Sequence, residues 1–181
     1  MNAPVALPPP QPTHPGVVLG IDPGLNRTGY AVLAPRGRTP ILREAGVIRS
    51  TPKLSLSERV REIGEGLQEV FEQYRPETVA LEQVFSTGQF PQSALLMAHA
   101  RGVILFIAAR NLCPVIGYAP RQVKRLLTGS GKADKRQIQL AVQSELRLAQ
   151  ILEPNDVADA AAIALCHYHS ARLPANPAER L

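Results

Sequence analysis

Hydrophobic and polar positions along the chain predict a sheet of short strands accompanied by helices. The runs VVLGID, TGYAVLA and ILREAGVI are separated by the turns PGLNR and PRGRTP, which predicts three antiparallel strands at the start of the fold. ETVALE and PVIGYA predict a fourth and a fifth strand. Because these strands alternate with helical patterns, we expect an α/β fold with a five-stranded mixed sheet flanked by helices.

Helical periodicity fills the segments between and after these strands. From Ser55 to Tyr74 the apolar positions recur at helical spacing, and Ser55 and Glu58 stand in capping-box register. Residues 92–111 predict a helix that is apolar nearly all round, with Gly102 where a second backbone could approach. Its complete burial would need neighbours on several sides, which this chain or another chain could supply. The later helices are predicted at PRQVKRLL, 135–149 and 156–172.

The two ends of the chain differ from the part between them. Residues 1–15 hold six of the 17 prolines and predict a disordered, Pro-rich tail, and residues 173–181 predict a flexible C-terminal tail. Residues 16–172 predict a single domain that is long enough to bury a core. No apolar run approaches the roughly 20 residues that span a bilayer, and the N-terminus has no secretory pattern. We therefore expect a cytoplasmic protein without a membrane partner.

The net positive charge is concentrated in one segment. The chain has 20 Lys and Arg against 15 Asp and Glu, for a formal charge of +5. The sixteen residues from 121 to 136 carry this whole excess, because they contain six basic residues and one acid. Such a segment is either a solvated helix face or a binding surface for a polyanion such as DNA. Its basic residues are Arg121, Lys124, Arg125, Lys132, Lys135 and Arg136.

Four carboxylates stand where predicted strands end or a helix begins. Asp22 ends the first strand, Glu82 ends the fourth, and Asp156 and Asp159 share one face at the start of the last helix. Each has an ordinary explanation alone, as a turn residue, a rim residue or a partner of the helix dipole. If they meet, two charges 4 Å apart repel by roughly 4 kcal/mol at an effective dielectric of about 20. Oxygen ligands suit Mg²⁺ or Mn²⁺, and two such ions would neutralise the four charges and support phosphodiester hydrolysis.

These residues lie in motifs that resemble the RuvC family of bacterial Holliday junction resolvases, within the ribonuclease H-like superfamily. GIDPGLNRTGYAV at 20–32 and LEQVF at 81–85 are similar to the first two family motifs, and NDVADAAAIA at 155–164 is similar to the last. PRQVKRL and GSGKADK match the patterns between them. The resemblance spans about residues 17–170. Ala31 stands where the family usually has glycine, and the Pro-rich head is an extension.

The resemblance implies a ribonuclease H-like nuclease domain and roles for the matched residues. Asp22, Glu82, Asp156 and Asp159 would be catalytic and would bind two Mg²⁺ or Mn²⁺ ions per active site. Lys124 and Lys135 would contact DNA together with the rest of the basic segment. This segment would lie separately from the carboxylates, which repel DNA. Exposed aromatic residues in loops can stack on unpaired bases, and Phe85 in the second motif is the candidate for this contact.

The resemblance also implies how the protein would work as an assembly. A C2 homodimer would bind a four-way DNA junction and nick two strands of like polarity, leaving 5′-phosphate and 3′-hydroxyl ends that ligase can seal. The RuvA-RuvB branch-migration complex is the implied protein partner. The apolar helix at 92–111 is the candidate dimer interface, although an ordinary buried helix explains its pattern equally well.

Two other functions are compatible with parts of the sequence. Actin-like ATPases share a GID-G-TG phosphate motif, but they need two duplicated lobes and 181 residues provide only one. A junction-binding protein without catalysis would need the same basic segment. The intact set of four carboxylates favours an endonuclease over this second alternative.

Overall fold

One mixed sheet with the strand order β3-β2-β1-β4-β5 forms the centre of the molecule. The computed structural model describes residues 16–37, 39–83 and 91–171, so the two predicted tails lie outside the described residues. The first three strands pair antiparallel, as predicted, whereas β4 pairs parallel with β1 and β5 pairs parallel with β4. The strands are β1 (Val18–Asp22), β2 (Arg27–Arg36), β3 (Thr39–Arg49), β4 (Thr78–Glu82) and β5 (Val115–Tyr118).

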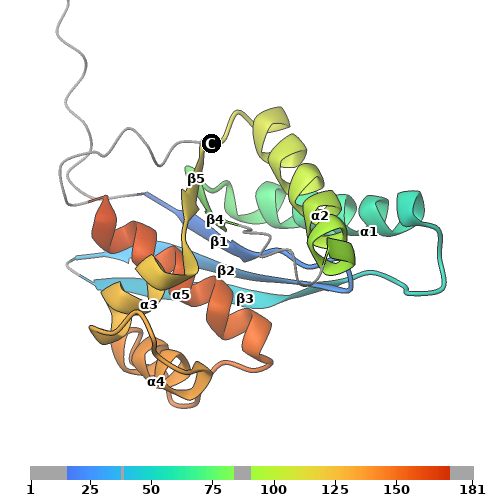
Figure 1. Cartoon of the computed structure of the whole chain (residues 1–181). Helices are drawn as coiled ribbons and strands as arrows, with labels where there is room; N and C mark the ends of the chain where they lie inside the picture. The colour runs from blue at the N-terminus through green and yellow to red at the C-terminus, as the bar shows by residue number, and fades with distance from the viewer. Residues whose placement is uncertain (1–15, 38, 84–90, 172–181) are drawn as a thin grey trace, which may run out of the picture.

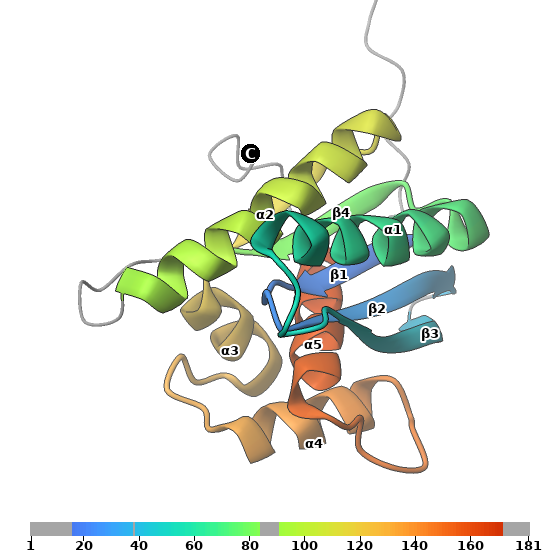
Figure 2. The same ribbon diagram turned by 90° about the vertical axis from the view of Figure 1, so that its right-hand side faces the viewer.

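Helices cover both faces of this sheet (Figures 1 and 2). One face carries α1 (Leu56–Tyr74) and α2 (Pro91–Arg110). The other carries α3 (Pro120–Thr128), α4 (Lys135–Glu145) and α5 (Asn155–Ser170). The predicted mixed sheet flanked by helices is confirmed. In the described part of the chain, no helix combines the length and the apolar character needed to cross a membrane.

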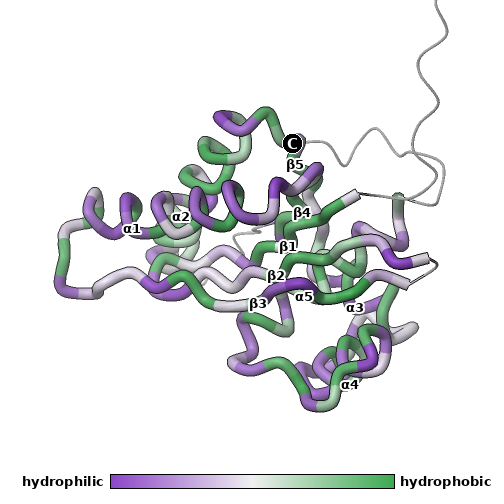
Figure 3. The backbone as a smooth tube through the Cα atoms, turned by 180° about the vertical axis from the view of Figure 1, so that it is seen from behind, coloured by the Kyte–Doolittle hydropathy of each residue, from purple (hydrophilic) through white to green (hydrophobic). Residues whose placement is uncertain are grey.

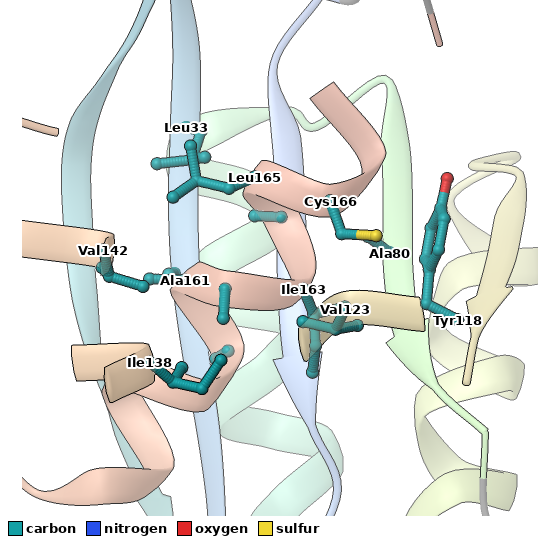
Figure 4. Close-up of a cluster of buried hydrophobic side chains, with 14 of the residues drawn as sticks. Leu33, Ala80, Tyr118, Val123, Ile138, Val142, Ala161, Ile163, Leu165 and Cys166 are labelled. Carbon is teal, nitrogen blue, oxygen red and sulfur yellow. The ribbon is translucent and has the colours of Figure 1, made fainter. Parts of the chain in front are cut away.

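Alternation along the central strands builds a separate hydrophobic core on each face. Leu19 and Leu81 pack with the helices α1 and α2, whereas Val18 and Ala80 belong to the core under α5. Figure 3 shows β1 and β4 as largely hydrophobic strands, as expected for strands that are covered on both faces. Figure 4 shows the second core, where Leu165 and its neighbours on α5 lie against the sheet.

Local signals account for most of the helix boundaries. The predicted capping box at the start of α1 is present, with Ser55 accepting from the N–H of Glu58. The helix predicted at 135–149 is shorter, because α4 ends at Glu145. Arg147 has a left-handed φ of 53°, and the N–H of Leu148 donates to the oxygen of Gln143 at 2.9 Å. The chain therefore turns away before the predicted end.

Two glycines bring α5 into direct contact with the sheet. A Cβ at Gly20 of β1 would lie 2.2 Å from the main-chain oxygen of Ala160 and 2.7 Å from the Cβ of Ala164. A Cβ at Gly29 of β2 would lie 2.0 Å from the main-chain oxygen of Asp156. Both positions leave room only for a hydrogen atom. Because Gly20 and Gly29 have no side chain, α5 can pack directly against the backbone of β1 and β2.

Gly20→Ala is expected to destabilise the protein by about 1–3 kcal/mol, because the added methyl group forces α5 away from β1. Urea denaturation at equilibrium measures this change. Gly64→Ala in α1 is the matched control, since its Cβ would make an ordinary contact 3.7 Å from Val103. Alanine is the better helix residue by roughly 0.5–1 kcal/mol, so the control should be neutral or stabilising. Wild-type stability of Gly20→Ala would contradict the close packing of α5.

Candidate active site

The structure brings the four predicted carboxylates together at one end of the sheet. Asp22 is the last residue of β1 and Glu82 is the last residue of β4, and these neighbouring parallel strands stay paired up to the residues just before them. Asp156 and Asp159 lie in the first turns of α5, close to the same strand ends. All three of the other carboxylates interact electrostatically with Asp22. Two strand ends and one helix therefore form a single acidic site.

Burial and mutual repulsion raise the pKa values of these acids. Burial, followed by the charges of Glu82, Asp159 and Asp156, raises the pKa of Asp22 to about 8. Burial and the Asp159 charge raise the pKa of Glu82 to about 6, although Lys124 and a hydrogen bond with Asp22 act in the opposite direction. Burial is also the main cause of the raised pKa of Asp159. The site therefore favours either bound protons or a bound cation.

Two lysines of the basic segment lie inside this acidic site. Lys124 of α3 and Lys135 of α4 line a pocket of about 220 Å³ together with Glu82 and Asp159. Both lysines lower the pKa of Asp159, and Lys135 also lowers that of Asp22. The prediction that the basic segment lies apart from the carboxylates is thus wrong for these two residues. The other four basic residues are exposed on or before α3 and α4: Arg121, Arg125, Lys132 and Arg136.

Two arginines that the sequence analysis does not single out contact members of the carboxylate set. Arg27, at the start of β2, places Nε 3.3 Å from Oδ2 of Asp156. Arg101 of α2 donates from Nη1 to the main-chain oxygen of Glu82 at 2.6 Å. Arg27 lies within the first matched motif, which is a signal that could have found it. Arg101 lies in an apolar helix, where the sequence gives no comparable signal.

The donor set fits a hard divalent cation better than zinc. It consists of carboxylate oxygens, and a cation would relieve the repulsion that raises their pKa values. Among the described residues, no three His, Cys, Asp or Glu side chains are already arranged to hold a metal ion. Asp156 is paired with Arg27, so a cation bound by all four carboxylates would compete with Arg27 for Asp156. Phe85 belongs to residues 84–90, which lie outside the described residues.

In the absence of divalent metal, the protein is expected to lose stability as the pH rises from about 7 to about 8. The pKa of Asp22 is 3.8 ordinarily and about 8 in the folded protein, so the folded state holds a proton that the unfolded chain has released. The free energy of unfolding then falls with pH by at most about 1.4 kcal/mol per pH unit for this one proton. His167 adds little in this window, because burial lowers its pKa from 6.5 to about 4 in the folded protein and the unfolded imidazole is already mostly neutral above pH 7.

Urea denaturation in EDTA at several pH values in this window measures the effect. Asp22→Asn removes the titrating group and should flatten the pH dependence. Equal slopes for the wild type and Asp22→Asn would contradict the raised pKa of Asp22.

Known proteins resemble this chain along most of its length. The family model of crossover junction endodeoxyribonuclease RuvC matches residues 18–167. The chain belongs to the RuvC family. It is 51% identical to the RuvC of Rhodopirellula baltica over 168 residues, which cover 93% of this chain and 94% of the relative. It is 40% identical to the RuvC of Desulforamulus reducens, with coverage of 83% and 92%. As a RuvC-family member, the chain is an endodeoxyribonuclease.

Solved structures support the same assignment. Thermus thermophilus RuvC, in a complex with a Holliday junction substrate, matches with a TM-score of 0.85 at 36% identity, over 92% of this chain and 99% of that chain. The yeast mitochondrial Holliday junction resolvase matches with a TM-score of 0.60 at 17% identity, over 86% and 79%, and therefore shows the fold alone. The ribonuclease H-like fold that the motif resemblance implies is confirmed.

Proposed function

We propose that this chain is a homodimeric resolvase that binds four-way DNA junctions and nicks two strands of like polarity. The observation that carries the proposal is the meeting of four carboxylates and two lysines at one end of the sheet in a RuvC-family chain. The solved relative from Thermus thermophilus is bound to a Holliday junction substrate, which supports this class of DNA as the ligand.

Asp22, Glu82, Asp156 and Asp159 would hold two divalent ions, Mg²⁺ or Mn²⁺. When bound, such ions activate water for attack on phosphorus and stabilise the oxygen that leaves. Lys124 and Lys135 would draw the scissile phosphate into the pocket, where the carboxylates alone would repel it. Hydrolysis breaks the bond between phosphorus and the 3′ oxygen, so each nick has a 5′-phosphate and a 3′-hydroxyl that ligase can seal.

Helix α2 supports the homodimer. Its residues Ala100 and Ile104 are buried against the domain, whereas Leu95 and Phe106 are 62% and 63% exposed. A Cβ at Gly102 would meet no atom within 4 Å, so a second backbone has room to approach. A second copy on this helix would bury the exposed apolar side chains. It would also present two identical sites to two symmetry-related strands of a junction.

The remaining contacts follow from the motif resemblance and from exposure. The exposed basic residues outside the pocket would bind backbone phosphates, and Phe85 would stack on an unpaired base. We place this activity in the cytoplasm, with the RuvA-RuvB branch-migration complex as the protein partner.

The proposal is tested with the purified protein, a synthetic four-way junction and a duplex of the same sequence, each with and without Mg²⁺. We expect a dimer by analytical ultracentrifugation and two symmetric nicks in the junction only when metal is present. The nicked products should be sealed by ligase. Junction binding without cutting at any divalent metal concentration would identify a non-catalytic binding protein, and equal cutting of the duplex would contradict junction selectivity.

A further inference from the structure

Glu82 lies where β4 parts from β1, while it still pairs with Tyr118 of β5. The pairing between β1 and β4 ends at Ile21 and Leu81, so Glu82 lies beyond the last residue pair of that ladder. On the side of β5, the N–H of Gln83 donates to the oxygen of Tyr118 at 2.9 Å. The carbonyl of Glu82 itself accepts the 2.6 Å hydrogen bond from Arg101. The end of β4 is thus held by β5 and by α2.

Arg101 is a partly buried cation whose described polar contact is this carbonyl. Burial lowers the pKa of its guanidinium. Among the described residues, no carboxylate lies within ion-pair distance of it. Burying a guanidinium is unfavourable unless its N–H groups are hydrogen-bonded, so the contact with Glu82 offsets part of that cost. The contact is also short and charge-assisted, as in the stronger class of hydrogen bonds.

The guanidinium acts on the main chain of Glu82. The charges that shift the pKa of the Glu82 carboxyl come from Asp159 and Lys124, and Arg101 is not among them. Arg101 is therefore placed to fix the backbone from which the carboxylate projects. Since α2 also carries the exposed apolar side chains, one residue joins that helix to the end of the catalytic strand.

We propose that Arg101 is the positioning residue for Glu82, holding the end of β4 so that this carboxylate faces the metal site, and that it ties the site to α2. The proposal rests on the metal-binding role given to Glu82 above. Partners that orient metal ligands in this way typically affect metal affinity or activity by about 10–100-fold. Because Arg101 contacts backbone and not the reacting atoms, its loss should act on metal binding and on kcat more than on junction binding.

The test begins with Mn²⁺ binding to the DNA-free dimer, measured by isothermal titration calorimetry. Arg101→Met keeps much of the aliphatic stem and removes the donors, and it should weaken Mn²⁺ binding by about tenfold or more. Arg101→Lys keeps a charged donor and should restore most of the affinity. Arg61→Met is the matched control, because Arg61 lies on α1 in an exposed pair with Glu65. It should bind Mn²⁺ like the wild type.

A double-mutant cycle then asks whether Arg101 acts through Glu82. Glu82→Gln should weaken Mn²⁺ binding, and adding Arg101→Met to it should produce little further loss. On junctions, Arg101→Met should lower kcat by about tenfold or more and leave KM nearly unchanged. If the methionine variant does not fold, Arg101→Gln takes its place in the same cycle.

Three results would overturn the inference, and the first two of them would leave the proposed function standing. Wild-type Mn²⁺ affinity in Arg101→Met, beside a clear loss in Glu82→Gln, would reject the positioning role alone. A raised KM with unchanged kcat would make Arg101 a DNA contact instead. If Glu82→Gln binds Mn²⁺ like the wild type, the metal site itself is misplaced and the proposed function fails with it.

Discussion

Asp22→Asn is expected to lower the rate of junction cutting by about a thousandfold or more while leaving junction binding within about twofold. Asparagine has nearly the same shape as aspartate, so the strand end and the packing of α5 should persist. It carries no charge, however, and it is a poorer ligand for a hard divalent cation. Asp22 interacts with all three other carboxylates, so its loss should weaken the whole metal site. Single-turnover cutting and gel-shift binding of a labelled junction measure the two quantities separately.

Asp134→Asn is the matched control for this substitution. Asp134 caps α4 by accepting from the N–H of Gln137 at 2.8 Å, and asparagine caps helices about as well as aspartate. The control should therefore cut junctions at the wild-type rate. In the absence of metal at pH 8, Asp22→Asn should also be more stable than the wild type, because it removes a charge that is repelled by Glu82 and Asp159. An unchanged cutting rate in Asp22→Asn would show that Asp22 is not an active-site residue.

The carboxylates could be predicted from the sequence because their positions follow from secondary structure. Asp22 and Glu82 each end an apolar run, and the ends of neighbouring parallel strands meet at one edge of a sheet. Asp156 and Asp159 are three apart on a helix, so they share a face. The glycines that bring this helix to the strands carry no such signal by themselves. Gly20 and Gly29 fit strand patterns, and their role appears only when α5 is seen against them.

The arrangement of the cations could not be predicted in the same way. Charge counted along the chain puts Lys124 and Lys135 in one segment, but α3 ends at a left-handed Gly129, with a φ of 76°, and Lys135 begins the separate helix α4. Both lysines then face the pocket. The charges of Arg27 and Arg101 are balanced by acidic residues elsewhere in the sequence, so the charge count does not reveal them. Arg27 contacts a residue more than a hundred positions away, and Arg101 contacts one about twenty positions away. Tertiary contacts of this kind leave no local pattern.

Junction affinity is expected to depend strongly on salt concentration. If all six basic residues of the segment meet phosphates, the logarithm of junction affinity should fall with the logarithm of salt concentration with a slope of roughly −5. Such a slope corresponds to a loss of about a thousandfold in affinity between 50 and 200 mM salt. Replacing the exposed Arg121, Arg125, Lys132 and Arg136 by glutamine should reduce the slope by roughly 3 to 4, because each lost phosphate contact removes about 0.9. Fluorescence anisotropy with a labelled junction measures these slopes.

The two pocket lysines should behave differently from the four exposed residues, because they face carboxylates as well as DNA. Lys124→Gln with Lys135→Gln should reduce the slope by about 2 and should also raise the pKa of Asp159 further, since both lysines now lower it. The pH at which cutting reaches half its maximum should therefore move upward in this double variant only. Arg61→Gln, which removes an exposed cation from α1, should change neither quantity. A wild-type slope near zero would contradict phosphate binding by the whole segment. An unchanged pH profile in the double variant would show that the two lysines do not affect the pKa of Asp159.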